Sequence, residues 1–267
     1  MRNRLTGVAM VAAAAIAAAF VVLHRSGPAE TAPAAGPSFV GEAERLPPPE
    51  RPAFTVASPV LLPRGEKSAR FAPVIRNVEA RRAPATGAAP VAPLDLKTPE
   101  GTTNVVLVIG ARSGPDGLWA HVRLPVLPNN LTGWVPRSAL GGYQFVHTHL
   151  VVDRARLRAT LFYDAREIFT APVGVGTDAS PTPAGSFYIR DRLAGFGNPF
   201  YGPVAFGTSA RSAVLTDWPG GGFVGIHGTN QPELIPGRVS HGCVRMRNAD
   251  ILRLSRLMPV GTPLTIR

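Results

Sequence analysis

The 267-residue sequence contains very little cysteine and very little lysine. Cys243 is the only cysteine, which excludes an intramolecular disulfide framework and any metal or iron–sulfur site built on several cysteines. It leaves one thiol that is either buried and inert or chemically used. Lys67 and Lys97 are the only lysines, so the net charge of +11 comes almost wholly from arginine. Such a charge suits an anionic partner or simply an arginine-rich composition. An apolar content of 45% excludes wholesale disorder.

The first 27 residues have the pattern of a membrane segment. Arg2 and Arg4 precede an uncharged run from residue 5 to residue 23. As a helix, this run would be about 28 Å long, close to the ~30 Å hydrocarbon core of a bilayer. Because it exceeds the apolar region of most cleaved signal peptides, we interpret it as a retained anchor, with a cleaved signal as the alternative. The charge excess before the run predicts that the rest of the chain lies outside the cytoplasm, where nucleic acid is not an expected partner.

Proline marks the next part of the chain. Half of the 28 prolines lie between residues 28 and 99, and residues 28–70 show no helical or strand period, which predicts an extended linker.

Residues 71–142 hold about five short β-like runs bounded by turn residues, a pattern typical of a small barrel. Residues 119–125, followed by residues 133–135, resemble bacterial SH3-like domains. That resemblance implies a module that binds wall peptide or anchors its neighbour.

Residues 143–267 form the longest coherent region, and their pattern is mainly β. Short runs with strand character predict a β-meander with a turn at Asp164-Ala165. The expected strands are residues 150–153, 157–163 and 168–175. Only residues 249–258 have a clear helical pattern, with Asn248 as the expected N-cap.

The residues suited to catalysis gather near the C-terminus. His227 is followed after twelve residues by Ser240-His241-Gly242-Cys243. The thiolate is the nucleophilic form of cysteine, and a neighbouring imidazole can take the thiol proton. Adjacent glycines let a substrate backbone approach and leave amide N–H groups for an oxyanion. A lone cysteine or histidine is usually structural, but two histidines beside glycines around the only cysteine favour nucleophilic catalysis.

His227 and Ser240-His241-Gly242-Cys243 together resemble the catalytic signature of the L,D-transpeptidases (YkuD type). Gly174-Val175-Gly176 and residues 182–187 resemble the strand and turn that lead into the site of that family. The resemblance covers about residues 145–267. It implies a mainly β protein with a β-rich, YkuD-like sandwich or barrel as its catalytic domain, preceded here by the SH3-like barrel and the N-terminal transmembrane helix.

The resemblance also implies a role for each residue of the signature. Cys243 would be the nucleophile that forms a thioester, and His227 the general base. The Gly228 carbonyl would hold the His227 imidazole, while His241 would shape the pocket and share in proton transfer. Amides near Gly242 and Cys243 would face the oxyanion. The residues expected to bind substrate or line the cleft are Ser240, Gly242, Arg245, Tyr201, Trp218 and the glycines at 220–222.

The implied reaction exchanges one amide for another and needs no cofactor or metal. Cys243 would expel D-alanine from a peptidoglycan tetrapeptide stem, and an amine of a neighbouring stem would then accept the acyl group in a 3→3 cross-link. With water as the acceptor, the enzyme would be an L,D-carboxypeptidase. The chain is expected to act as a monomer that contacts the membrane through residues 5–23.

Four other classes of protein share part of this pattern. A sortase also has the order His, Cys, Arg, but its cysteine normally follows a threonine-rich strand motif far from its histidine. Papain-like wall hydrolases place cysteine before histidine, the opposite of the order of His227 and Cys243. His147 and His149 on one face of a strand would suit a metal hydrolase, although no acidic cluster accompanies them. The last alternative is a non-catalytic wall-binding protein with an inert Cys243.

Overall fold

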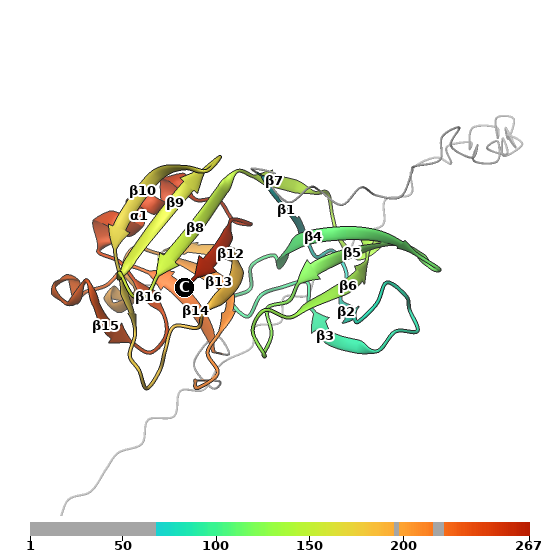
Figure 1. The fold of residues 1–267 in the computed structure, drawn as a ribbon, viewed down its shortest axis with the longest axis horizontal. Helices are drawn as coiled ribbons and strands as arrows, with labels where there is room; N and C mark the ends of the chain where they lie inside the picture. Colours follow the sequence, from blue (N-terminus) through green and yellow to red (C-terminus); the bar gives the residue numbers. More distant parts are fainter. Residues whose placement is uncertain (1–67, 195–197, 216–221) are drawn as a thin grey trace, which may run out of the picture. The chain divides into compact units, whose positions relative to one another are not determined.

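The computed structural model describes residues 68–194, 198–215 and 222–267, which belong to one compact unit (Figure 1). The predicted anchor at residues 1–27 and nearly all of the predicted linker at residues 28–70 lie outside these residues, as does Trp218. Within the described ranges, no helix is long and apolar enough to cross a membrane. The anchor therefore stays a prediction.

Seven strands form the first sheet, where about five were expected, in the order β3-β2-β6-β5-β4-β1-β7. They are β1 (Ala69–Pro73), β2 (Val78–Arg81), β3 (Pro90–Leu94), β4 (Val105–Gly114), β5 (Gly117–Arg123), β6 (Thr132–Pro136) and β7 (Gln144–Val146), with a 3-10 turn η1 (Arg137–Ala139) after β6. All pairs are antiparallel. Gly117, at φ 115°, makes the tight turn between β4 and β5. The SH3-like resemblance of this sheet stays a prediction, as does the division of the chain at residues 142 and 143.

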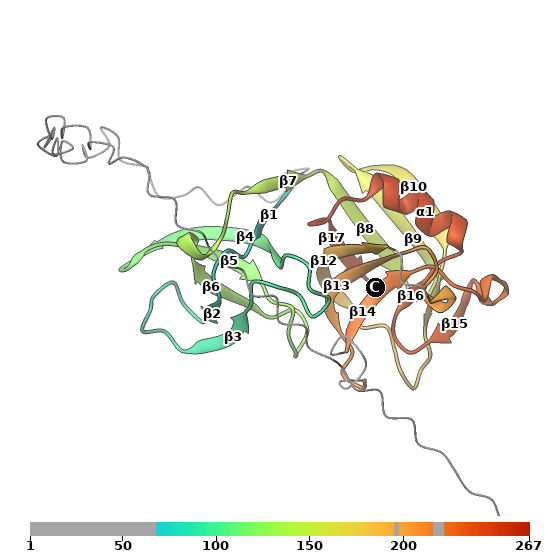
Figure 2. The same ribbon diagram turned by 180° about the vertical axis from the view of Figure 1, so that it is seen from behind.

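Ten strands form the second sheet, in the order β10-β9-β8-β17-β12-β13-β14-β16-β11-β15. They are β8 (Thr148–Asp153), β9 (Arg158–Tyr163), β10 (Arg166–Pro172), β11 (Gly174–Gly176), β12 (Gly185–Ala194), β13 (Val204–Arg211), β14 (Phe223–His227), β15 (Gly237–Ser240), β16 (Val244–Arg245) and β17 (Pro263–Ile266). Two 3-10 turns, η2 (Pro199–Tyr201) and η3 (Pro232–Leu234), and one helix, α1 (Asn248–Leu257), complete the described elements. Figure 2 shows α1 beside β9 and β10, and its Ile251 and Leu254 are buried in the core of this sheet.

The predicted meander is confirmed in β8, β9 and β10, with Asp164 and Ala165 at φ 47° and 66° in the turn. The expected third strand is divided, because residues 166–172 pair with β9 whereas residues 174–176 pair with β15 and β16. The expected N-cap at Asn248 is wrong. Arg247 is the N-cap and makes no side-chain cap bond, while the Asn248 side chain accepts the Thr229 N–H at 2.9 Å.

Three groups of buried apolar side chains hold the described unit together. One fills the first sheet, and a second lies between the second sheet and α1. The third joins the two sheets, where Phe71, Leu107 and Val146 pack with Tyr188 of β12. Apolar burial contributes roughly 25 cal/mol per Å² removed from water. Burial of these side chains therefore stabilises the contact between the two sheets, which are also joined by the chain between β7 and β8.

Candidate active site

Two neighbouring strands bring the predicted catalytic residues together. β14 ends at His227, and β16 begins at Val244, directly after Cys243. The two strands pair in parallel, with Ile226 beside Val244 and His227 beside Arg245. This pairing brings His227 and Cys243, which are sixteen positions apart in the sequence, onto neighbouring strands.

The Cys243 thiol lies against the backbone of β14. The Gly225 N–H donates to Cys243 Sγ at 3.3 Å. A methyl group added at Gly225 would lie 3.9 Å from Cys243 Sγ and 3.8 Å from His227 Cδ2. Both side chains therefore border the space that this glycine leaves open.

The His227 side chain is buried, with 2% of its surface exposed. Its Nδ1 lies 2.6 Å from the Gly228 carbonyl oxygen. A carbonyl only accepts, so Nδ1 must carry the proton, and Nε2 is left as the basic nitrogen. The ring of Tyr201 meets the imidazole edge-on at a centroid distance of 5.1 Å. The predicted acceptor, Gly228, thus fixes the tautomer that a general base needs.

Burial keeps both members of this pair neutral. Desolvation lowers the pKa of His227 to about 4, with a smaller lowering by the positive charge of Arg245, against the opposing bond to Gly228. Desolvation also raises the pKa of the Cys243 thiol, although the Gly225 N–H and Arg245 favour its thiolate. At neutral pH the resting site therefore holds a thiol and a neutral imidazole.

The loop that carries the nucleophile is fixed by hydroxyl groups. Ser240 Oγ donates to the Cys243 carbonyl at 2.5 Å and accepts the Gly242 N–H at 3.1 Å. Thr182 Oγ1 donates to the Gly242 carbonyl and accepts the Gly176 N–H, both at 2.8 Å. Gly242 has φ 117°, a conformation that favours glycine. Ser240 and Gly242, which were predicted to bind substrate, are thus bonded within the loop that carries Cys243.

The loop after His227 is fixed by a close approach of two glycines. Side chains at Gly202 or Gly228 would collide with the opposite backbone and with Asn248 Oδ1. That oxygen accepts the Thr229 N–H at 2.9 Å. These contacts hold the peptide whose carbonyl binds His227.

A cleft opens over the thiol and brings together most of the predicted residues. Its lining residues are Phe200, Tyr201, Ser212, Leu215, Gly222, Phe223, Val224, His227, Ser240, His241, Cys243 and Arg245. His241 is exposed there, and the guanidinium of Arg245 lies 4.5 Å above the ring of Phe200. Sequence reasoning missed Phe200, Gly225 and Asn248 as members of the site. The Gly-x-His spacing at residues 225–227 is the one signal that pointed to any of them.

The histidines considered for a metal hydrolase have other partners. His147 Nδ1 lies 2.8 Å from Asp164 Oδ1, and His149 Nε2 lies 2.8 Å from Thr265 Oγ1. In the ranges that the structure describes, no three His, Cys, Asp or Glu side chains are grouped as metal ligands.

Part of the chain is similar to known proteins. Residues 147–266 match the family model of YkuD, the L,D-transpeptidase catalytic domain. The chain is 36% identical over 118 residues to a Bacillus subtilis (strain 168) protein named as the L,D-transpeptidase YkuD, a match that covers 44% of this chain and 65% of that protein. It is 32% identical over 138 residues to the Escherichia coli (strain K12) protein named as the L,D-transpeptidase YbiS, covering 44% of each.

The solved catalytic domain of an Enterococcus faecium L,D-transpeptidase is 25% identical, with 45% of this chain and 96% of that chain covered and a TM-score of 0.34. The chain spans 65% and 57% of the length of two curated YkuD relatives. The matched region contains both His227 and Cys243. Residues 147–266 are thus similar to the YkuD family of L,D-transpeptidase catalytic domains.

Proposed function

We propose that this chain is a cysteine-dependent acyltransferase that joins peptidoglycan stem peptides outside the cytoplasmic membrane. One observation carries the proposal. The thiol of Cys243 and the imidazole of His227 line the same cleft, and Nδ1 of the imidazole is bound to the Gly228 carbonyl. This leaves Nε2 to exchange a proton with the thiol.

In the first half of the reaction, Cys243 Sγ attacks the carbonyl carbon of the L-centred third residue of a tetrapeptide stem. Nε2 of His227 takes the thiol proton and then gives it to the amine of the departing D-alanine. The C–S bond forms, the C–N bond breaks, and a thioester remains on Cys243. Since the thiol and the imidazole are both neutral at rest, the imidazole can accept the thiol proton without first losing a proton of its own.

In the second half, an amine of a neighbouring stem attacks the thioester. His227 takes a proton from that amine and returns it to the departing sulfur, so that the neutral pair is restored. Attack by an amine on the third residue of the neighbouring stem gives a 3→3 cross-link, and attack by water gives a shortened stem.

The oxyanion formed in each half needs an N–H donor. The Gly242 N–H already donates to Ser240 Oγ, so we assign the oxyanion to the amide of Cys243. Arg245 and Tyr201 line the cleft and are proposed to contact polar groups of the stem. Ser240 contributes through the loop that its hydroxyl closes.

The proposed location follows from the sequence. Residues 5–23 would anchor the chain in the cytoplasmic membrane, and residues 28–70 would space the catalytic domain toward the wall. The chain would act as a monomer. The arginine excess would favour contact with an anionic wall polymer, an attraction that salt weakens.

The test uses the full chain and a carbapenem as an acylating probe. Intact-mass analysis should show one covalent adduct on the native chain and none on Cys243→Ala. An adduct on Cys243→Ala, or no adduct on the native chain under reducing conditions, would contradict the assignment.

A purified disaccharide-tetrapeptide then separates the remaining alternatives. Cross-linked dimer with released D-alanine supports the transpeptidase, and disaccharide-tripeptide alone indicates the carboxypeptidase. Bound but unchanged substrate would indicate a wall-binding protein.

A further inference from the structure

The peptide between Val224 and Gly225 is held at both ends. Its N–H, from Gly225, donates to Cys243 Sγ at 3.3 Å, and its carbonyl, from Val224, accepts from Thr208 Oγ1 at 2.6 Å. The two groups of a trans peptide point in opposite directions. The Thr208 hydroxyl therefore fixes the carbonyl on the β13 side and aims the N–H at the thiol.

Thr208 occupies a special place in β13. The pairing of β13 with β14 is regular up to Gly207 opposite Gly225, and its register then shifts before Arg211. Thr208 stands at the start of this irregularity, and its side chain is fully buried. Its hydroxyl also accepts the Ala210 N–H at 3.1 Å. A side chain thus holds the strand at the point where the regular ladder is interrupted.

Asp191 of β12 binds the backbone of β13 at Gly207, the residue before Thr208. Its Oδ1 accepts the Gly207 N–H at 2.8 Å, and a side chain at position 207 would collide with this carboxylate. Gly207 is the direct partner of Gly225. Asp191 is buried, and its burial is the main cause of a raised pKa. A buried carboxylate at this place is costly unless it is bonded, and the Gly207 N–H is one of its donors.

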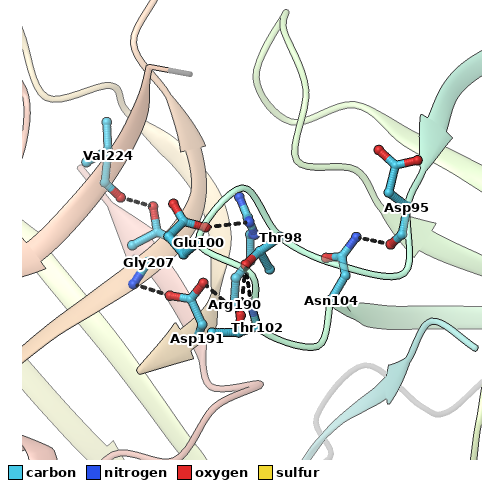
Figure 3. Close-up of polar contacts among 10 residues, drawn as sticks. Asp95, Thr98, Glu100, Thr102, Asn104, Arg190, Asp191, Gly207 and Val224 are labelled. Carbon is cyan, nitrogen blue, oxygen red and sulfur yellow. Dashed lines mark hydrogen bonds and ion pairs between the residues drawn. The ribbon is translucent and has the colours of Figure 1, made fainter. Parts of the chain in front are cut away.

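The first sheet supplies the second donor (Figure 3). Thr102, in the loop between β3 and β4, donates from Oγ1 to Asp191 Oδ2 at 3.3 Å. In the same loop, Glu100 lies 3.5 Å from the guanidinium of Arg190. Arg190 is 2% exposed and lies 3.9 Å above the ring of Phe223, the first residue of β14 and part of the cleft wall. The loop therefore contacts two neighbouring residues of β12, both of which bear on β13 or β14.

We propose that Thr208 is a positioning residue for the nucleophile, which it serves by aiming the Gly225 N–H at Cys243 Sγ, and that Asp191 and Thr102 support it from behind. This rests on the proposed function only in taking Cys243 as the nucleophile. An N–H donor at the sulfur favours the thiolate, and a carbonyl that is itself bonded strengthens that donor. Residues of the first sheet thereby contribute to the reactivity of a thiol in the second.

The test measures how readily Cys243 reacts with iodoacetamide as a function of pH. Because the chain has one cysteine, intact mass of the full chain reports this thiol alone. Thr208→Val removes the hydroxyl and keeps the shape. We expect the midpoint of the alkylation profile to rise by about half to one pH unit and the rate at pH 7 to fall roughly 3- to 10-fold. His227, His241, Arg245 and Tyr201, the titratable and charged groups that line the cleft with the thiol, are unchanged in this variant.

Two comparisons separate positioning from stability. Thr208→Ser keeps the hydroxyl and should restore the native profile. Thr148→Val is the matched control, because Thr148 is a buried threonine of β8 whose hydroxyl lies 2.6 Å from that of Thr262. It should lower the melting temperature and leave the profile unchanged. Thr102→Val should shift the profile in the same direction as Thr208→Val but less, with Thr86→Val, another loop threonine of the first sheet, as its control.

A native profile in folded Thr208→Val would overturn the proposal. If that variant does not fold, Thr208→Ala and Thr208→Ser decide, since both lose the same methyl group and only Ser keeps the hydroxyl. Equal profiles for these two would overturn the proposal as well. A native chain that alkylates normally but takes no carbapenem would refute the proposed function and leave the positioning role standing.

Discussion

The two sheets of this chain bury very different side chains. Among the described residues, the buried polar side chains of the first region (residues 68–146) are Thr98 and Asn104, whereas the second region (residues 147–267) holds fourteen, including His227, Thr182 and Thr208. His121 of the first sheet is partly exposed and stacks on Trp134 at a centroid distance of 4.5 Å. Buried polar groups destabilise a fold unless they are bonded. The second region carries more of this cost, so equal substitutions should have unequal effects in the two regions.

The largest expected effect is on the rate of acylation. His227→Ala removes the base and should slow formation of the carbapenem adduct by about 10²–10⁴-fold. His121→Ala, which removes a histidine from the first sheet, should leave the rate unchanged. Both rates are measured by intact mass at neutral pH. Native acylation by folded His227→Ala would transfer the role of base to His241.

The next largest effect is on the pH dependence of stability. The pKa of His227 is about 4 in the folded chain, below its usual 6.5, so only the unfolded chain binds this proton between these values. Stability conferred by the neutral histidine is therefore present above pH 6.5 and is lost as pH falls toward 4, by up to about 3 kcal/mol. Urea unfolding across this range measures the loss, which His227→Gln should largely abolish. An equal dependence of the unfolding free energy on pH in His227→Gln would show that other groups cause the loss of stability.

A smaller effect is expected where one hydroxyl serves two backbone groups. Thr182→Val leaves the Gly242 carbonyl and the Gly176 N–H without their bonds to Oγ1 and should cost roughly 2 kcal/mol of unfolding free energy. Thr86→Val, which breaks one exposed hydroxyl bond to Asp116 in the first region, should cost under about 0.5 kcal/mol. Chemical denaturation compares the two. Equal losses would contradict the contrast between the sheets.

The smallest effect concerns the loop after His227. Asn248→Ala removes the acceptor of the Thr229 N–H and should cost about 1 kcal/mol. Because that loop carries the Gly228 carbonyl, acylation should slow about 3-fold while Cys243 alkylation stays native. A change in the rate of alkylation without a change in the rate of acylation would contradict the role of Asn248 in positioning His227.

The sequence was most informative where its signals were local. Alternating side chains predicted the meander of β8, β9 and β10, and the motif around Cys243 predicted the nucleophile loop. The N-cap prediction at Asn248 failed because its side chain is used by Thr229, a residue nineteen positions away, which no local pattern records. Gly225 was missed for the same reason, since its role depends on Cys243 across a strand pair.

The sequence by itself determined which residues we propose for catalysis, because one cysteine, two histidines and their glycines occur in a fixed order between residues 227 and 243. It also determined that the chain would be mainly β. Only the tertiary structure decided the state of that chemistry. Burial holds the thiol and the imidazole neutral, and pairing of β13, β14 and β16 aims the Gly225 N–H at the sulfur. Protonation and orientation depend on which groups surround a side chain in space, and those groups come from strands far apart in the sequence.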